Sequence, residues 1–247
     1  MDQQPYLSVV VPAYNEEKRI PATLESMYTY LTKQTFSWEL LIVLDGCTDD
    51  TIGAVTRFSA DKQHIRWIDR QENRGKGYTV REGMLAAKGQ IRLFSDADNS
   101  TDLSHFDKMR PLFTGGKDIV IASRDGKDAE GATQAVPQSG LKRLLGNLGN
   151  LFIQVMAVPG IWDTQCGFKA FSAESAQKIF SHTNMDGWVF DIEALALARR
   201  YGYSIGIIGA HWIDAEGSHV DRSHYINSLL ETTKLRWNLL TGKYPKR

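Results

Sequence analysis

Two aspartates, Asp96 and Asp98, lie one residue apart just after an apolar run at residues 91–94. Side chains at i and i+2 of an extended strand point the same way, so both carboxylates can face one site beyond the strand. Such hard oxygen ligands suit Mg²⁺ or Mn²⁺, which leave positions for water and substrate phosphate oxygens. In the competing interpretation these residues form a turn, and Thr101 or Asp102 caps the next helix. The polar clusters elsewhere in the chain favour the metal site.

Each of these clusters follows an apolar run and precedes a helical pattern. The predicted strands span residues 7–11, 39–44, 65–68 and 91–95. This alternation predicts an α/β fold with a doubly wound, mostly parallel sheet. In such sheets ligands bind beyond the carboxyl ends of the strands, where the strand order reverses, so converging clusters indicate a nucleotide site. No single cluster suffices, since Gly75-Lys76-Gly77 matches neither the dinucleotide fingerprint nor the P-loop.

The pattern changes after residue 100. It predicts a helix near 103–113, a strand at 118–122 and a polar, glycine-rich loop to about residue 138. A helix with an apolar face, a short strand ending at Phe171, helices ending at Phe180 and Tyr201, and a strand at 205–213 follow. Because neither an internal repeat nor a linker interrupts the 247 residues, we expect one domain.

The composition excludes several classes of protein. Basic and acidic side chains balance at 29 each, whereas a nucleic-acid binder that acts through bulk charge shows a basic excess. Cys47 and Cys166 lack metal-ligand spacing and are predicted to be free thiols in a reducing compartment. The first residues lack the basic and apolar regions of a signal peptide. We therefore expect a cytoplasmic protein without a nucleic-acid partner.

Two segments could contact a membrane surface. Residues 144–162 carry no charge, but their glycines, asparagines and Pro159 make them too polar to span a bilayer. The tail from Ser223 has an apolar helical stripe with basic margins, consisting of Ile226, Leu229, Leu230, Trp237 and Leu240. Such a helix can lie in a bilayer interface. Packing of both segments on the domain is the alternative, and the sequence leaves both open.

Four segments together resemble the nucleotide-sugar half of the family-two glycosyltransferases: VVPAYNE at 10–16, LDGCTD at 44–49, NRGKG at 73–77 and DAD at 96–98. DTQCGFK at 163–169 and WVFDIE at 188–193 resemble the dolichyl-phosphate β-glucosyltransferases, and slightly less closely the mannosyltransferases. The resemblance implies a single domain of the GT-A type over residues 1–247. It divides the chain into a nucleotide-sugar half (7–100), an acceptor half (101–222) and an amphipathic basic tail (223–247).

The resemblance also implies roles for individual residues. The base and ribose pocket would be lined by Pro12, Ala13, Tyr14 and Glu16. Asp45 would hydrogen-bond the base, and the nucleotide would be flanked by Asn73, Arg74 and Lys76. Asp96 would meet ribose or sugar hydroxyls, while Asp98 would ligate Mg²⁺ or Mn²⁺ on the diphosphate. The mannosyl branch has glutamine where this chain has Ser100, which puts one metal contact in doubt.

A polyprenyl-phosphate acceptor would explain why no obvious general base stands out. The second pKa of a phosphate monoester is about 6, so its oxygens are ionised near neutral pH. Cationic side chains would then hold the acceptor, and the candidates are Arg124, Arg143 and Lys169, each of which could also be surface charge. Asp163 belongs to the same predicted site. Asp191 and Glu193 would orient Lys169 or favour the helix dipole.

One displacement at the anomeric carbon predicts inversion and a β-linked product. UDP and glucose as donor groups rest on the resemblance alone, and the sequence does not indicate the oligomeric state. One rival is a family-two transferase with a hydroxyl acceptor, which needs a carboxylate base such as Asp191 or Glu193. The other rival is a nucleotide-sugar binding protein without turnover.

Overall fold

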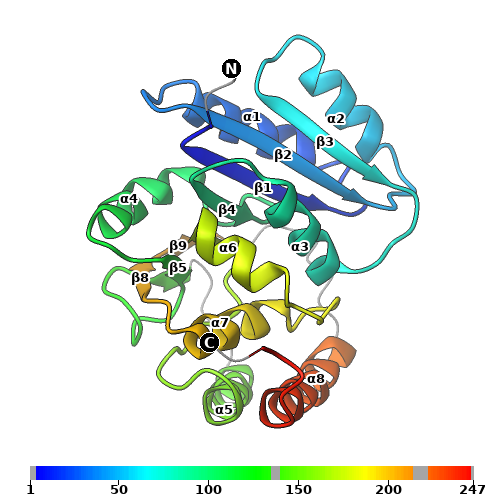
Figure 1. Cartoon of the computed structure of the whole chain (residues 1–247). Coiled ribbons are helices and arrows are strands. Elements are labelled where there is room, and N and C mark those ends of the chain that lie inside the picture. Colours follow the sequence, from blue (N-terminus) through cyan, green and yellow to red (C-terminus); the bar gives the residue numbers. More distant parts are fainter. Residues whose placement is uncertain (1–3, 135–139, 214–221, 246–247) are drawn as a thin grey trace.

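A mixed seven-stranded sheet forms the centre of the computed structural model, which describes residues 4–134, 140–213 and 222–245 (Figure 1). The strand order is β3-β2-β1-β4-β7-β5-β8, in which only β7 runs antiparallel to its neighbours. The strands are β1 (Leu7–Ala13), β2 (Trp38–Asp45), β3 (Ile65–Arg70), β4 (Ile91–Ser95), β5 (Ile119–Ser123), β7 (Phe168–Ser172) and β8 (Ile205–Gly209). The predicted α/β class with a mostly parallel sheet is therefore confirmed.

Helices cover both faces of this sheet. The helices in the described parts of the chain are α1 (Ile20–Leu31), α2 (Thr51–Ser59), α3 (Lys76–Ala86), α4 (Phe106–Thr114), α5 (Gly140–Met156), α6 (Ala173–Phe180), α7 (Phe190–Tyr201) and α8 (Arg222–Leu240), with a short 3₁₀ turn at Leu103–His105. Alternate residues of β1 enter different cores: Val10 packs in the core that contains α3, α6 and α7 residues, and Val9 in the core that contains α1, α2 and α4 residues. This burial of both faces explains why β1 is apolar except at Ser8, whose buried hydroxyl donates to Glu39.

The strand order reverses between β1 and β4, which lie side by side at the centre of the sheet. β7 enters antiparallel beside β4, with Phe168 opposite Ser95. The start of β7 therefore meets the end of β4, and the N–H of Asp96 donates to the carbonyl of Gly167 at 3.1 Å. The topology thus brings the segment before β7 to the aspartate pair, at the position where ligands bind in doubly wound sheets.

The strand predicted at 205–213 is divided in the structure. β8 ends at Gly209, and β9 (His211–Trp212) pairs instead with β6 (Thr133–Gln134) in a separate two-stranded sheet. A Cβ atom at Gly209 would lie 2.4 Å from the carbonyl oxygen of Glu130, so the glycine permits this close crossing of the two segments. The prediction of one continuous strand was wrong because periodicity does not reveal a change of partner.

The two segments with predicted membrane contact, α5 and α8, lie next to each other at the end of the molecule away from β3 (Figure 1). On α8, Leu230, Trp237 and Leu240 of the predicted stripe are exposed, whereas Leu235, which falls off the stripe, is fully buried. One side of α8 therefore packs on the protein and another presents apolar side chains. No helix in the described parts of the chain has the length and hydropathy required to cross a bilayer.

Candidate active site

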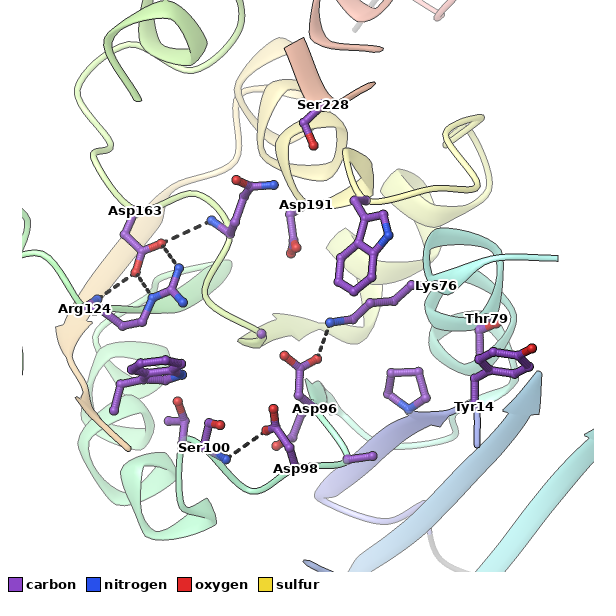
Figure 2. Close-up of a pocket in the computed structure, with 18 of the residues that line it drawn as sticks. Tyr14, Lys76, Thr79, Asp96, Asp98, Ser100, Arg124, Asp163, Asp191 and Ser228 are labelled. Atoms are coloured by element: carbon purple, nitrogen blue, oxygen red, sulfur yellow. Dashed lines mark hydrogen bonds and ion pairs between the residues drawn. The ribbon is translucent and has the colours of Figure 1, made fainter. Parts of the chain in front are cut away.

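A cleft of about 1240 Å³ lies beyond the carboxyl ends of β1 and β4 (Figure 2). It gathers most of the residues that the sequence predicts, from segments more than 170 positions apart. The predicted residues that line it are Pro12, Ala13, Tyr14, Glu16, Asp45, Asn73, Lys76, Asp96, Asp98, Arg124, Asp163 and Asp191. Four predicted site residues remain. The side chains of Arg74, Lys169 and Glu193 do not line the cleft, and the side chain of Arg143 lies outside the described residues.

Asp96 and Asp98 both point into this cleft (Figure 2). Asp96 forms an ion pair with Lys76 at the start of α3, with 2.7 Å between Nζ and Oδ1. Burial disfavours the charged Lys76, but the carboxylates of Asp96, Asp191 and Asp98 outweigh it and raise the pKa of the amine. Lys76 therefore stays a cation, and its Nζ lies 5.0 Å from the centre of the Trp188 ring.

Gly167 leaves the space that the Asp96 carboxylate occupies. A Cβ atom at Gly167 would lie 1.9 Å from Oδ2 of Asp96 and 2.2 Å from its Cγ. The backbone of Gly167 also accepts the hydrogen bond from the N–H of Asp96. Any larger residue at 167 would therefore displace the carboxylate from this position in the cleft.

The oxygens around Asp98 fit a divalent cation. Oδ1 of Asp98 accepts a hydrogen bond of 2.9 Å from the N–H of Ser100, which fixes the carboxylate. The hydroxyl of Ser100 lines the cleft, is buried and has no hydrogen-bond partner in the described parts of the chain. No group of three or more histidine, cysteine or acidic side chains among the described residues could enclose a metal. A cation here would keep positions for water and phosphate, as Mg²⁺ does.

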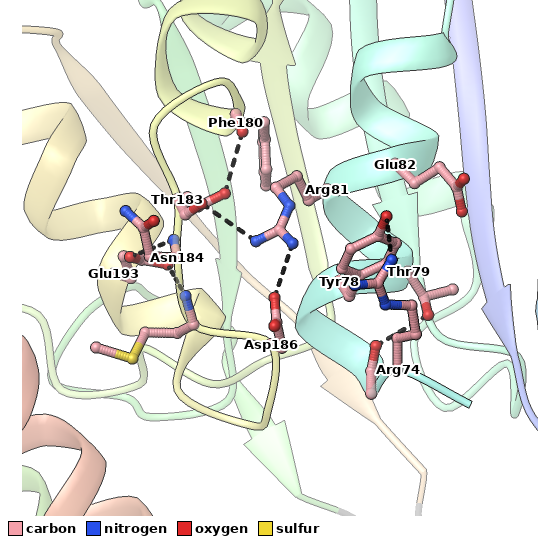
Figure 3. A network of polar contacts seen from close by, with 12 residues as sticks. Arg74, Tyr78, Thr79, Arg81, Glu82, Phe180, Thr183, Asn184, Asp186 and Glu193 are labelled. Carbon is pink, nitrogen blue, oxygen red and sulfur yellow. Dashed lines mark hydrogen bonds and ion pairs between the residues drawn. The ribbon is translucent and has the colours of Figure 1, made fainter. Parts of the chain in front are cut away.

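Asp45 holds the turn that leads into α3. Its carboxylate is buried and accepts from Arg70 at 2.5 Å and from the N–H groups of Arg74 and Gly75 at 2.8 and 3.0 Å. The side chain of Arg74 turns outward to the hydroxyl of Tyr78 at 3.0 Å (Figure 3). Arg74 therefore contributes its backbone to this turn, while its guanidinium does not line the cleft.

The glycines of the NRGKG motif let the loop that contains Met185 and Asp186 pack closely against the start of α3. The N–H of Gly77 donates to the carbonyl of Asp186 at 2.8 Å. A Cβ atom would lie 2.5 Å from the Asp186 carbonyl oxygen at Gly75, and 2.3 Å from that of Met185 at Gly77. Gly75 also has a φ of 95°, which favours glycine. These glycines thus allow close backbone packing and place Lys76 in the cleft.

Arg124 and Asp163 form a bidentate ion pair at the end of β5. Nε and Nη2 of Arg124 donate to the two Asp163 oxygens at 2.8 Å each, and the N–H of Arg124 donates to the same carboxylate. Burial opposes both charges, but the attraction between them outweighs it, raising the pKa of Arg124 and lowering that of Asp163. The Nη1 group of Arg124 forms no hydrogen bond within the described parts of the chain, and Arg124 lines the cleft.

Asp128 supports this pair and was missed by the sequence reasoning. Its Oδ2 accepts from the N–H of Asp163 and from the hydroxyl of Ser123, and its Oδ1 from the N–H of Trp162, each at 2.8 Å. Asp128 therefore fixes the backbone that carries Asp163. Nothing in its local sequence distinguishes it from the other polar residues of the loop after β5.

Lys169 does not reach the cleft, which corrects its predicted phosphate-binding role. It is fully buried on β7, and its Nζ donates to Asp191 at 2.6 Å and to the carbonyl of Cys166 at 2.5 Å. Asp191 does line the cleft, and the predicted pairing of these two side chains is present. Burial raises the pKa of Asp191 despite the opposing charges of Lys169 and Lys76.

Glu193 faces away from the cleft. It is fully buried and accepts hydrogen bonds from the N–H groups of Asn184 and Met185 and from the hydroxyl of Tyr244. Of the two carboxylates considered as general bases, only Asp191 is therefore within the cleft. Sequence reasoning also missed Trp212 of β9 and Ser228 of α8, and it assigned Leu229 to the apolar stripe of the tail without a place in the cleft; all three line the walls.

Comparison with known proteins agrees with this fold and these motifs. Residues 8–180 match the family model described as glycosyl transferase family 2. The dolichyl-phosphate beta-glucosyltransferase of Dictyostelium discoideum is 33% identical over 96% of this chain and 76% of its own length. The human protein of that name is 34% identical over 86% of this chain and 68% of its own.

A solved structure supports the fold at lower identity. Glucosyl-3-phosphoglycerate synthase from Mycobacterium tuberculosis, in complex with Mn²⁺, UDP-glucose and phosphoglyceric acid, has a TM-score of 0.65 and 18% identity over 96% of this chain and 80% of that chain. The matched family model covers β1 through α6, and the matched relatives extend over most of the chain. This protein therefore belongs to glycosyl transferase family 2 and is a glycosyltransferase.

Proposed function

We propose that this glycosyltransferase transfers glucose from UDP-glucose to a polyprenyl or dolichyl phosphate, with inversion to a β-linked lipid-phosphate sugar. The observation that carries the proposal is the position of α5 and α8. Gly149 and Ile153 of α5 and Leu229 of α8 line the cleft, and the same helices expose large apolar side chains. A lipid acceptor accounts for apolar walls beside a charged site, whereas a soluble sugar acceptor does not.

The donor half of the proposal rests on the aspartate pair. Asp98 and the unpartnered hydroxyl of Ser100 would hold Mg²⁺ or Mn²⁺, whose charge would stabilise the departing diphosphate. The M. tuberculosis enzyme of similar fold was crystallised with Mn²⁺ and UDP-glucose. Lys76 adds a fixed positive charge and keeps Asp96 in place beside the bound sugar. The residues from Pro12 to Glu16 would receive the nucleoside.

The acceptor half rests on Arg124. Because Asp163 engages only one edge of the guanidinium, the Nη1 edge can donate to phosphate oxygens while the pair remains intact. A phosphate that is already ionised needs no general base, and the position of Glu193 outside the cleft is consistent with such an acceptor. The curated relatives at 33 and 34% identity carry dolichyl phosphate and glucose in their names.

The lipid chain would lie along the exposed apolar face of α5 and α8. Side chains at least half exposed there are Leu148, Leu151, Val155, Leu230, Trp237 and Leu240. An apolar face of this kind, next to the cleft, is suited to rest on a membrane surface and to admit the lipid phosphate from it. We therefore propose peripheral membrane association through these two helices.

One observation favours a second candidate, a family-two transferase with a hydroxyl acceptor. Asp191 faces the cleft, and burial raises the pKa of its carboxyl group, a property that suits a general base. Its ion pair with Lys169 opposes that role, since the lysine stabilises the ionised carboxylate and reduces its basicity. We rank this candidate second.

A matched pair of lipids separates the two candidates. Purified protein with Mn²⁺ and labelled UDP-glucose should transfer glucose to detergent-dispersed polyprenyl phosphate but not to the corresponding polyprenol. Transfer to polyprenol or to free sugars, without transfer to the phosphate, would establish the hydroxyl-acceptor candidate instead. UDP-N-acetylglucosamine and GDP-mannose, each labelled in the sugar, serve as donor controls. If less label were transferred to the lipid from UDP-glucose than from either control, the donor assignment would be overturned.

A further inference from the structure

The segment that follows α8 is fastened to α7 by side-chain hydrogen bonds. Tyr244 is 1% exposed, and its hydroxyl donates to Oε1 of Glu193 at 2.6 Å. Arg200 of α7 donates to three carbonyls of the same segment, those of Leu239, Tyr244 and Pro245, at 3.2, 3.2 and 3.0 Å. The number of contacts here suggests a role beyond covering the core.

Glu193 also holds the loop at residues 183–188. Its Oε1 accepts from the N–H of Asn184 at 2.7 Å and its Oε2 from the N–H of Met185 at 2.9 Å (Figure 3). The hydroxyl of Tyr244 therefore shares one carboxylate with two backbone groups of this loop. Because Glu193 is fully buried, water cannot replace a lost donor without rearrangement of the site.

The 183–188 loop forms part of the cleft. Trp188 lines the cleft, and the Lys76 ammonium lies over its ring. The carbonyl of Asp186 accepts a hydrogen bond from the N–H of Gly77 at the start of α3. Arg81 of α3 holds the loop from outside through the carbonyl of Thr183 and the carboxylate of Asp186 (Figure 3). The position of the loop thus bears on where Trp188 meets Lys76, the lysine that is paired with the Asp96 carboxylate.

We propose that Tyr244 is a positioning residue of the cleft, which acts through Glu193 on the 183–188 loop and so on Trp188 and Lys76. The connection couples the docking of the segment after α8 to the geometry of the donor half of the site. It explains why the segment after α8 buries a tyrosine whose hydroxyl reaches 51 positions back in the sequence. Its effect on donor binding rests on the proposed function, whereas its effect on the loop does not.

The test compares Tyr244→Phe with Tyr203→Phe in the full-length protein. Tyr203 is the matched control, because its hydroxyl donates to Glu174 at 3.3 Å on the surface. Hydrogen–deuterium exchange without substrate should be about tenfold faster for the 183–188 amides in Tyr244→Phe, since a hydrogen bond to a buried charge is lost. The same amides in Tyr203→Phe should exchange as in the wild type. In the transfer assay, the KM for UDP-glucose should rise several-fold with little change in kcat.

Loop amides that exchange at the wild-type rate in Tyr244→Phe would overturn the proposal. If the protein turns over UDP-glucose, faster exchange together with an unchanged KM for UDP-glucose would overturn it as well. If UDP-glucose proves not to be a substrate, the exchange result still decides whether Tyr244 holds the loop. Should Tyr244→Phe fail to fold, Glu193→Gln provides the second variant. The glutamine side chain places an N–H group where one carboxylate oxygen accepted hydrogen bonds, so the loop amides should again exchange faster. Exchange at the wild-type rate would refute the role of this hydrogen-bond network in holding the loop.

Discussion

Gly167→Ala should disable the site with little effect on the fold. The new Cβ atom would lie 1.9 Å from Oδ2 of Asp96, whereas ordinary contact begins at 3.4 Å, so the carboxylate oxygen must move by about 1.5 Å. That movement breaks the 2.7 Å ion pair with Lys76. A misplacement of about 1 Å can reduce the rate about 100-fold, and we expect kcat/KM to fall by a similar factor. The φ of Gly167 lies outside the left-handed region, so alanine adds no backbone strain.

The assay is transfer of labelled glucose to polyprenyl phosphate, with the melting temperature measured on the same preparations. Gly126→Ala is the matched control, because nothing lies within 4 Å of a Cβ atom at that position. It should retain activity close to that of the wild type. If Gly167→Ala retained full activity, the position of the Asp96 carboxylate would not matter to the reaction. If it lost activity only in proportion to lost folded protein, Gly167 would be needed for stability alone.

Three other predictions concern binding and stability. Arg124→Lys keeps the charge but loses the bidentate geometry, so the KM for polyprenyl phosphate should rise about tenfold in initial-rate measurements, while an unchanged KM would remove Arg124 from the acceptor site. The pKa of Glu39 is lowered because its hydrogen bonds, including that from Arg66, outweigh the effect of burial. The ionised carboxylate therefore stabilises the fold above the unfolded-state pKa of Glu39, and this stabilisation is lost as pH falls through the folded-state pKa. Thermal melts should show Glu39→Gln less stable than the wild type at pH 7 and the difference shrinking in acid; a constant difference would contradict this linkage. Replacing Leu230 and Trp237 with serine should reduce sedimentation with anionic vesicles, with the melting temperature unchanged, and undiminished sedimentation would show that α8 is not the docking face.

The sequence was sufficient to predict the aspartate pair and its surroundings. Asp96 and Asp98 follow a strand whose side-chain alternation is fixed, and the parallel β-α pattern determines which edge of the sheet they occupy. The family motifs then added the residues from β1, β2 and α3. Local pattern and short-range geometry carry this information, so no long-range contact had to be known.

Lys169 shows where that reasoning fails. A lysine in a short strand has the same local pattern whether it faces a cleft or the protein interior. The difference arises because β7 inserts antiparallel between β4 and β5, which buries Lys169 next to Asp191. The roles of Asp128 and Tyr244 were also hidden, since each depends on a contact with residues more than 30 positions away. Their chemical types alone, an acid in a polar loop and a tyrosine in a basic tail, indicate nothing specific.

The proposed reaction requires that Asp98 holds a divalent cation on the diphosphate of the donor. Calorimetric titration of UDP-glucose into wild-type protein and Asp98→Asn, each with Mn²⁺ and with a chelator, tests it most directly. We expect Mn²⁺ to tighten binding to the wild type at least tenfold and to leave binding to Asp98→Asn unchanged. Equal binding by the wild type with and without Mn²⁺, or the same gain in Asp98→Asn, would contradict it.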